Sequence, residues 1–196
     1  VAGGSSGIGL GIAKECCRRS VPKITLLARN LQKLQEAQGD LKELCKSIKN
    51  TTTEIEIVSV SVSDYPALEQ ACQNLKISPQ DRVVLWNCAG FAHPQEFTQV
   101  PIEKFEAQIK TNQLGSMYLV RAMLPHIQRG CIVLTSSAAG QLGVYGYTTY
   151  APTKYAIRGF AETLHAELIR SHPELSIQLA FPVDTDTPGY QEELKL

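Results

Sequence analysis

The sequence has no excess charge of either sign, because its 19 Lys and Arg residues balance 19 Asp and Glu residues. A protein that binds nucleic acid needs clustered positive charge, and no basic stripe is present, so this class of partner is excluded. The chain also lacks a run of about 20 apolar residues, which leaves no candidate for a segment that spans a bilayer.

Metal and disulfide chemistry have equally little support. The 4 histidines are scattered and indicate no metal site. The 6 cysteines show no Cys-x-x-Cys spacing and lie mostly in expected helices or strands, which favours buried thiols in a reducing compartment over disulfides. The length of 196 residues suits one domain that spans residues 1–196. Because Val1 stands directly before a glycine loop, we expect the chain to be a piece of a longer protein, truncated at both ends.

What the sequence does contain is an alternation of short apolar runs and longer amphipathic segments. We expect strands at 24–28, 55–62, 82–86, 131–135 and 175–181, and helices at 30–49, 66–75, 102–126 and 150–171. Strands that alternate with helices indicate parallel βαβ units with right-handed crossovers. The sequence therefore predicts an α/β fold of the Rossmann-like, doubly wound type, with a parallel sheet in a three-layer α/β/α arrangement.

A glycine-rich loop lies near the start of the chain, between the end of an expected strand and a helix. Glycines let a pyrophosphate approach the backbone, and a helix N-terminus offers free N–H groups and a positive dipole end. This context predicts a dinucleotide site, and the alternative is an ordinary turn before a glycine-rich helix. The candidate residues are Gly3, Ser5, Ser6, Gly7, Ile8 and Gly9.

The end of the next strand suggests which dinucleotide would bind. Arg29 follows this strand directly with no acidic residue beside it, and Lys33 stands one helical turn further on. In this kind of fold an acidic residue at this place binds the ribose hydroxyls, whereas an arginine suits a 2′-phosphate. The two residues therefore favour NADPH as the cofactor, and the alternative is a pair of solvated cations at a helix start.

Tyr150 and Lys154 stand four residues apart on an expected helix and so share one face of it. A nearby cation lowers the pKa of a tyrosine from its ordinary value of about 10, which would prepare Tyr150 for acid–base catalysis. Ser137, across a glycine-containing loop, can offer its hydroxyl to a carbonyl oxygen. The alternative is an ordinary tyrosine and lysine on a helix surface.

Taken together and in this order, these features resemble the short-chain dehydrogenase/reductase family over essentially the whole chain. Besides the glycine loop and the Tyr150-x-x-x-Lys154 motif, the resemblance rests on Asn87-Cys88-Ala89-Gly90, Asn112, Ser137 and the segment 182–187. It implies a Rossmann-like sheet with a nicotinamide cofactor across the carboxyl ends of the strands. It also implies a catalytic tetrad, which would consist of Asn112, Ser137, Tyr150 and Lys154.

The resemblance further implies a role for each residue. Tyr150 would protonate the substrate oxygen, while Lys154 would lower the pKa of Tyr150 and hold the nicotinamide ribose. Ser137 would position the substrate carbonyl, and Asn112 would hold a water molecule that links Lys154 to solvent. Tyr150 would contact the cofactor as well as Lys154, and the remaining cofactor contacts would come from Asn87, Gly90, Pro182, Thr185 and Thr187.

Four positions depart from the family pattern. Ala2 replaces a usual threonine, and Ser61 stands where an aspartate usually contacts adenine, so both weaken the expectation of tight adenine binding. Val183 replaces a usual glycine. Pro152 lies inside the Tyr-x-x-x-Lys motif, and because proline is tolerated in the first helical turn, it predicts a helix that begins close to Tyr150.

A narrower resemblance is to the 3-ketodihydrosphingosine reductases. It rests on the glycine loop, the Ala28-Arg29-Asn30 corner and the segments 139–143, 156–159 and 182–189. That family reduces the keto group of 3-ketosphinganine with NADPH in sphingolipid synthesis, on the endoplasmic reticulum membrane with the catalytic domain facing the cytosol. The resemblance implies a long-chain lipid ketone as the substrate, and membrane association only through segments outside this chain.

One local feature fits a lipid substrate, because no charged residue occurs from Gly130 to Thr153. An uncharged wall would suit an alkyl chain, and the alternative is a buried strand followed by a packing loop. The wall would consist of Leu142, Val144, Tyr145 and Tyr147.

Three further expectations complete this interpretation. Asp184 or Asp186 would hold the amine of the substrate, unless the two residues only shape the turn after the last strand. The alternative functions are the same chemistry on a steroid or retinoid, and a nucleotide-binding scaffold without turnover. The long helices that contain Asn112 and Tyr150 are candidates for a homo-oligomer interface.

Overall fold

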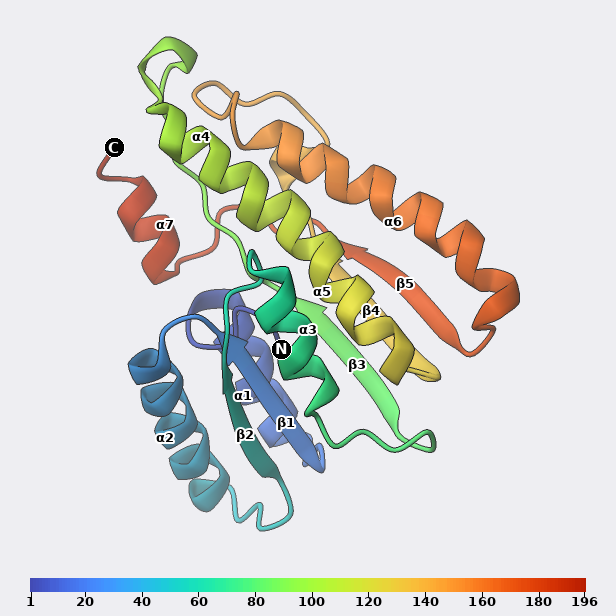
Figure 1. Ribbon diagram of the computed structural model, residues 1–196. Coiled ribbons are helices and arrows are strands. Elements are labelled where there is room, and N and C mark those ends of the chain that lie inside the picture. Colours follow the sequence, from blue (N-terminus) through green and yellow to red (C-terminus); the bar gives the residue numbers. More distant parts are fainter.

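The computed structural model describes residues 1–196 as a sheet of parallel strands between two layers of helices (Figure 1). All strand pairs are parallel: β1 with β2, and β4 with both β3 and β5. The predicted α/β fold is therefore confirmed, and the strand bounds differ from the predicted ones by a few residues at most. The strands are β1 (Lys23–Ala28), β2 (Glu54–Ser59), β3 (Arg82–Asn87), β4 (Arg129–Thr135) and β5 (Leu175–Ala180).

The beginning of the chain joins the two halves of this sheet. Ala2 forms parallel bridges to Leu27 in β1 and to Asn87 in β3. Its N–H donates to the carbonyl of Trp86 at 2.8 Å, and its carbonyl accepts from the N–H of Cys88 at 2.9 Å. The order across the sheet is thus β2, β1, Ala2, β3, β4, β5. The winding direction reverses at Ala2, and such a switch point is where α/β sheets bind their ligands.

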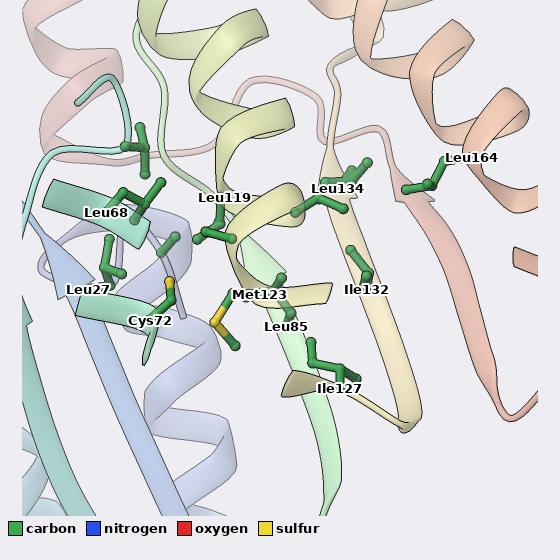
Figure 2. Close-up of a cluster of buried hydrophobic side chains, with 14 of the residues drawn as sticks. Leu27, Leu68, Cys72, Leu85, Leu119, Met123, Ile127, Ile132, Leu134 and Leu164 are labelled. Carbon is green, nitrogen blue, oxygen red and sulfur yellow. The ribbon is translucent and has the colours of Figure 1, made fainter. Parts of the chain in front are cut away.

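The helices divide between the two faces of the sheet (Figure 1). One face carries α1 (Gly7–Arg18) and α2 (Leu31–Ser47), and the other carries α3 (Tyr65–Gln73), α5 (Gly115–Met123) and α6 (Ala151–Ser171). Each face has its own core, with 9 buried apolar residues on the first and 19 on the second. Figure 2 shows the larger core, where α3 and α5 pack on β1, β3 and β4. Burial on both faces explains the continuous apolar run of the central strand β4, which is buried from Gly130 to Leu134.

The long helix expected at 102–126 is not regular, which corrects that prediction. It is divided into α4 (Ile102–Gln108), a π-helical segment at Ile109–Leu114, α5, and a 3-10 turn at Leu124–His126. Asn112 lies inside the π-helical segment and is only 1% exposed. The wider turn and the buried amide occur together, and π-helical turns are frequent at functional sites.

The helix that carries the Tyr-x-x-x-Lys motif begins where Pro152 predicts. The cap residue of α6 is Tyr150, and Pro152 lies in its first turn, so this expectation is confirmed. A short helix that was not predicted, α7 (Pro188–Glu193), follows the last strand; it begins at a proline, and the Thr187 hydroxyl caps it by accepting from the N–H of Tyr190 at 3.1 Å. None of the helices has the length and apolarity that crossing a membrane requires.

Truncation of a leucine in the core of Figure 2 should cost more stability than truncation of an exposed leucine. Leu134 in β4 is 0% exposed, so Leu134→Ala should lower the free energy of unfolding by about 2–5 kcal/mol, because it loses buried contacts and leaves a cavity. The matched change Leu31→Ala, at a leucine that is 50% exposed, should cost less than about 0.5 kcal/mol. Urea titrations of both variants measure the difference, and equal losses would contradict this description of the core.

Candidate active site

The glycine loop packs so closely that side chains do not fit in it. Gly3 and Gly7 have φ angles of +73° and +52°, which favour glycine. A Cβ on Gly9 would lie 2.3 Å from the carbonyl oxygen of Gly3, so the first turn of α1 rests directly on the loop. The Ser6 side chain makes no capping bond to α1, and its hydroxyl stays exposed. This loop and the free N–H groups at the helix start fit the pyrophosphate of a dinucleotide.

The segment after β3 connects the glycine loop to the motif residues. A Cβ on Gly3 would lie 2.7 Å from the N–H nitrogen of Ala89, so the two loops are in backbone contact. Asn87 is 3% exposed, and its amide donates to the hydroxyl of Ser116 at 2.7 Å. A Cβ on Gly90 would lie 3.0 Å from Asn112 Oδ1 and 3.5 Å from the Lys154 Nζ. Gly90 therefore stands directly beside two members of the expected tetrad.

Asn112 holds the loop after β3 in place. Its Oδ1 accepts from the N–H of Phe91 at 3.0 Å, and its Nδ2 donates to the carbonyl of Phe91 at 2.9 Å. Nδ2 also lies 3.3 Å from the hydroxyl of Thr153 in α6. These bonds fix the distance between the π-helical segment, the loop and α6. The role of Asn112 in holding a water molecule stays a prediction.

Tyr150 and Lys154 lie together at the start of α6. The Lys154 ammonium is 5.4 Å from the centroid of the Tyr150 ring, and it donates to the carbonyl of Thr135 at 3.0 Å. Lys154 is only 6% exposed and takes part in no salt bridge. An ammonium has three donors, so the bond to Thr135 leaves donors that can bind the hydroxyls of a ribose.

The neighbouring residues Ser136 and Ser137 differ in burial and in hydrogen-bond partners. The hydroxyl of Ser136 is buried and donates to the carbonyl of Lys154 at 2.9 Å, so it fixes the backbone of α6. Ser137 is half-buried, accepts from the N–H of Ala139 at 3.2 Å, and lies next to the Tyr150 phenol. Of the two hydroxyls, only that of Ser137 is placed to meet a substrate carbonyl.

The pKa of Tyr150 differs from the expectation. Burial raises it to about 12, whereas the neighbouring Ser137 hydroxyl lowers it and the Glu193 carboxylate raises it. Burial also lowers the pKa of Lys154 to about 8. The expected lowering of the Tyr150 pKa by Lys154 is therefore wrong for this structure, because the ammonium lies over the ring face and does not offset the burial of the phenol. A phenol with this pKa is protonated at neutral pH, which is the form that a proton donor needs.

Arg29 and Lys33, which are expected to bind the 2′-phosphate, lie at the same carboxyl edge of the sheet as the glycine loop. Gly3 N–H donates to the carbonyl of Leu27 at 2.8 Å, which places the glycine loop beside the carboxyl end of β1. Arg29 follows that end directly, and both Arg29 and Lys33 are exposed and free of salt bridges. The two cations are thus available to an anion that approaches the end of β1.

Only part of the segment 182–187, which follows β5, lies at the site. The Pro182 carbonyl accepts from the N–H of Ala138 at 3.1 Å, beside Ser137. The side chain of Thr187 lies 3.2 Å from the place a Cβ on Gly7 would occupy, so it touches the glycine loop. Thr185 is exposed and donates to the carbonyl of Val183 at 2.8 Å, which is a local turn contact.

Two side chains at the site were not predicted as polar site residues. The Tyr147 and Tyr150 rings lie 5.7 Å apart, and the Tyr147 hydroxyl donates to Glu193 Oε2 at 3.3 Å. Glu193 comes from α7, which stands beside the carboxyl edge of the sheet (Figure 1). No motif includes Glu193, so no signal in the sequence points to it. Tyr147 was assigned only to an apolar wall.

The two aspartates after β5 have local partners instead. Asp184 accepts from the Tyr190 hydroxyl at 3.1 Å, and Asp186 accepts from the Gln191 amide at 2.8 Å. Both aspartates are exposed and stabilise α7. The geometry therefore favours the alternative that they shape the turn, and it does not support either of them as the amine handle.

The expected uncharged wall is mostly a surface feature. Leu142, Val144 and Tyr145 are 56%, 38% and 83% exposed, so they do not form a buried packing loop. The N–H of Gln95 donates to the carbonyl of Gly146 at 2.8 Å, which holds this loop against the one that follows β3. The three exposed residues of the wall lie shortly before Tyr150 in the chain and are open to an apolar ligand.

Comparison with known proteins agrees with this geometry. Residues 1–195 match the family described as short chain dehydrogenase, and the chain belongs to that family. The polyketide ketoreductase of actinorhodin synthesis, solved with NADPH, superposes with a TM-score of 0.86 at 23% identity, covering 100% of this chain and 73% of that one. A closed serine dehydrogenase with NADP+ gives 0.85 at 24% identity, covering 100% and 75%.

Among curated relatives, the chain is similar to proteins named as reductases of 3-dehydrosphinganine or 3-ketodihydrosphingosine. The chain is 40% identical to 3-dehydrosphinganine reductase of Danio rerio over 201 residues, which cover 100% of this chain and 58% of that protein. It is 41% identical to 3-ketodihydrosphingosine reductase of Mus musculus, again over 201 residues and 58% of the relative. The chain thus spans less than two thirds of the length of these relatives.

Proposed function

We propose that the protein containing this chain reduces 3-ketosphinganine to sphinganine with NADPH, a step of sphingolipid synthesis. The observation that carries the proposal is the similarity to sphinganine-forming reductases along the whole chain, combined with the convergence of Ser137, Tyr150 and Lys154 on one site. The same similarity favours attachment to the endoplasmic reticulum membrane, with the catalytic domain facing the cytosol.

The cofactor would lie across the carboxyl edge of the sheet. The glycine loop and the start of α1 would hold the pyrophosphate, while Arg29 and Lys33 would hold the 2′-phosphate. Lys154 would bind the nicotinamide ribose through the donors that Thr135 leaves free. Thr187, whose side chain lies against Gly7, would contact the bound cofactor beside the loop. When bound, NADPH supplies the hydride.

The chain's own residues supply orientation and the proton. Ser137 and the Tyr150 phenol bind the oxygen of the substrate ketone, which fixes the carbonyl carbon in position. As negative charge develops on that oxygen, Tyr150 donates its proton to it. The phenol carries this proton at neutral pH, since its pKa, which burial raises to about 12, lies well above neutrality. The Lys154 ammonium, held by Thr135 over the Tyr150 ring, keeps its remaining donors for the nicotinamide ribose.

The test of this function uses the full-length protein in detergent or liposomes. NADPH oxidation is followed with 3-ketosphinganine, a steroid ketone and a retinal. We expect the highest kcat/KM for 3-ketosphinganine. A higher value for the steroid or the retinal would replace the substrate class and keep the reductase, and no oxidation with any of them would favour a nucleotide-binding scaffold.

A change at Arg29 tests the preference for NADPH over NADH. A hydrogen bond to a charged group contributes about 1.5–3 kcal/mol, so Arg29→Ala should weaken NADPH binding by about 10- to 100-fold. Binding of NADH should be nearly unchanged, because it lacks the 2′-phosphate. Fluorescence titration with both cofactors measures the two affinities, with Arg19→Ala, on the surface of α1, as the control. Equal losses for NADPH and NADH would rule out the role of Arg29 at the phosphate.

A further inference from the structure

The carboxylate of Glu193 has an unusual environment for its residue type. It is half-buried and takes part in no salt bridge, although exposed Lys and Arg residues pair with acids elsewhere in the chain. Its Oε2 accepts from the Tyr147 hydroxyl at 3.3 Å. Burial and the Asp184 carboxylate raise its pKa, while the Tyr147 hydroxyl, the backbone of Ala92 and the charge of Lys154 favour its charged form. A partly buried anion that makes no salt bridge within the protein is suited to a cationic ligand.

The carboxylate also lies close to the reacting groups. Tyr147 connects them, because its hydroxyl contacts Glu193 and its ring lies 5.7 Å from that of Tyr150. Burial is the main cause of the raised pKa of Tyr150 and of the lowered pKa of Lys154, and the negative charge of Glu193 adds to the first shift and opposes the second. The carboxylate is therefore within electrostatic reach of both groups. The neighbouring acids Asp184 and Asp186 are exposed and engaged with Tyr190 and Gln191.

The chemistry of the proposed substrate supplies the matching cation. In 3-ketosphinganine the amine stands on the carbon next to the ketone, so its nitrogen is two bonds from the carbonyl carbon. When the ketone oxygen is bound by the Tyr150 phenol, the ammonium must lie within a few ångströms of it. The ammonium would also lie near the Lys154 ammonium, and a carboxylate between the two offsets their repulsion.

We propose that Glu193 is the residue that binds the ammonium group of a 2-amino ketone and so selects amino ketones over other long-chain ketones. This inference rests on the proposed reductase function and names a determinant of its specificity. Tyr147 is the positioning residue, since its hydroxyl orients the Glu193 carboxylate towards Tyr150. The alkyl chain would then extend over the exposed Leu142 and Val144.

The test compares 3-ketosphinganine with a ketone of equal chain length in which a hydroxyl replaces the amine. The wild-type protein should prefer the amino ketone in kcat/KM, and Glu193→Gln should reduce this preference by about 10- to 100-fold, mainly through KM. Glu193→Asp keeps the charge and should retain part of the preference. The matched control is Glu192→Gln, because Glu192 is an exposed neighbour that pairs with Lys195 and should keep the full preference.

The outcomes separate this inference from the function on which it rests. If the wild-type protein reduces neither ketone, the reductase function itself fails. If the wild-type protein reduces both equally, or Glu193→Gln keeps the preference, the amine site is wrong and the reductase remains. A fluorescence titration with NADPH shows that each variant is folded, so a lost preference cannot be mistaken for a lost fold.

Discussion

Tyr150→Phe should lower the rate of ketone reduction by about 10²- to 10⁴-fold, which is the typical contribution of general acid catalysis. The change removes the phenol oxygen and keeps the ring, so the contact with Tyr147 at 5.7 Å should survive. Tyr150 is half-buried at the start of α6, and its side chain makes no hydrogen bond to the backbone that the change would remove. The fold and NADPH affinity should therefore remain close to those of the wild-type protein.

Single-turnover reduction, in which NADPH oxidation is followed with enzyme in excess, isolates this step. The matched control is Tyr155→Phe, which removes the same atom from the same helix at a residue that is 43% exposed. We expect the control to keep its rate. A Tyr150→Phe protein with a rate within a few-fold of the wild type would show that another group donates the proton.

Shortening the alkyl chain of the substrate should have an effect of similar size. Each methylene removed from water contributes about 0.8 kcal/mol, so a substrate shorter by six methylenes should lose up to about 3 × 10³-fold in kcat/KM. The loss should appear in KM, because the ketone and its neighbours at Ser137 and Tyr150 are unchanged. The exposed Leu142, Val144 and Tyr145 are the surface on which the chain would be bound.

A series of amino ketones of decreasing length, measured with the full-length protein in liposomes of fixed lipid content, gives this dependence. Replacing Leu142 by serine should flatten the slope of kcat/KM against chain length, whereas the matched change of the exposed Leu31 should not. A kcat/KM that does not depend on length would remove the long-chain lipid as the substrate class and leave the reductase in place.

Local sequence features were enough to predict the sheet and most of the helices. Apolar runs such as 24–28 and 131–135 have no alternative to burial on both faces, so they are found as β1 and β4. Pro152 predicted the start of α6 because its ring forbids an earlier helical turn. The π-helical segment around Asn112 was missed, since its pattern of apolar residues resembles that of an ordinary helix. The bonds of Asn112 within it go to Phe91, which lies 21 residues away in the sequence.

The site, like the fold, could be predicted from the sequence only in part. The sequence by itself determined the chemical groups of this protein: a glycine loop, a Tyr-x-x-x-Lys pair and a cation after β1 are all local patterns with fixed spacing. Only the tertiary structure decided the direction of the Tyr150 pKa, because burial depends on residues distant in sequence that cover the phenol. It also decided which acid lies near the reacting groups. Asp184 and Asp186 stand closer in sequence to the end of β5, yet their side chains bond to Tyr190 and Gln191 in α7, and it is Glu193 of α7 that reaches Tyr147. Which of these carboxylates lies at the site depends on the path of the chain after β5, and no local sequence pattern predicts that path.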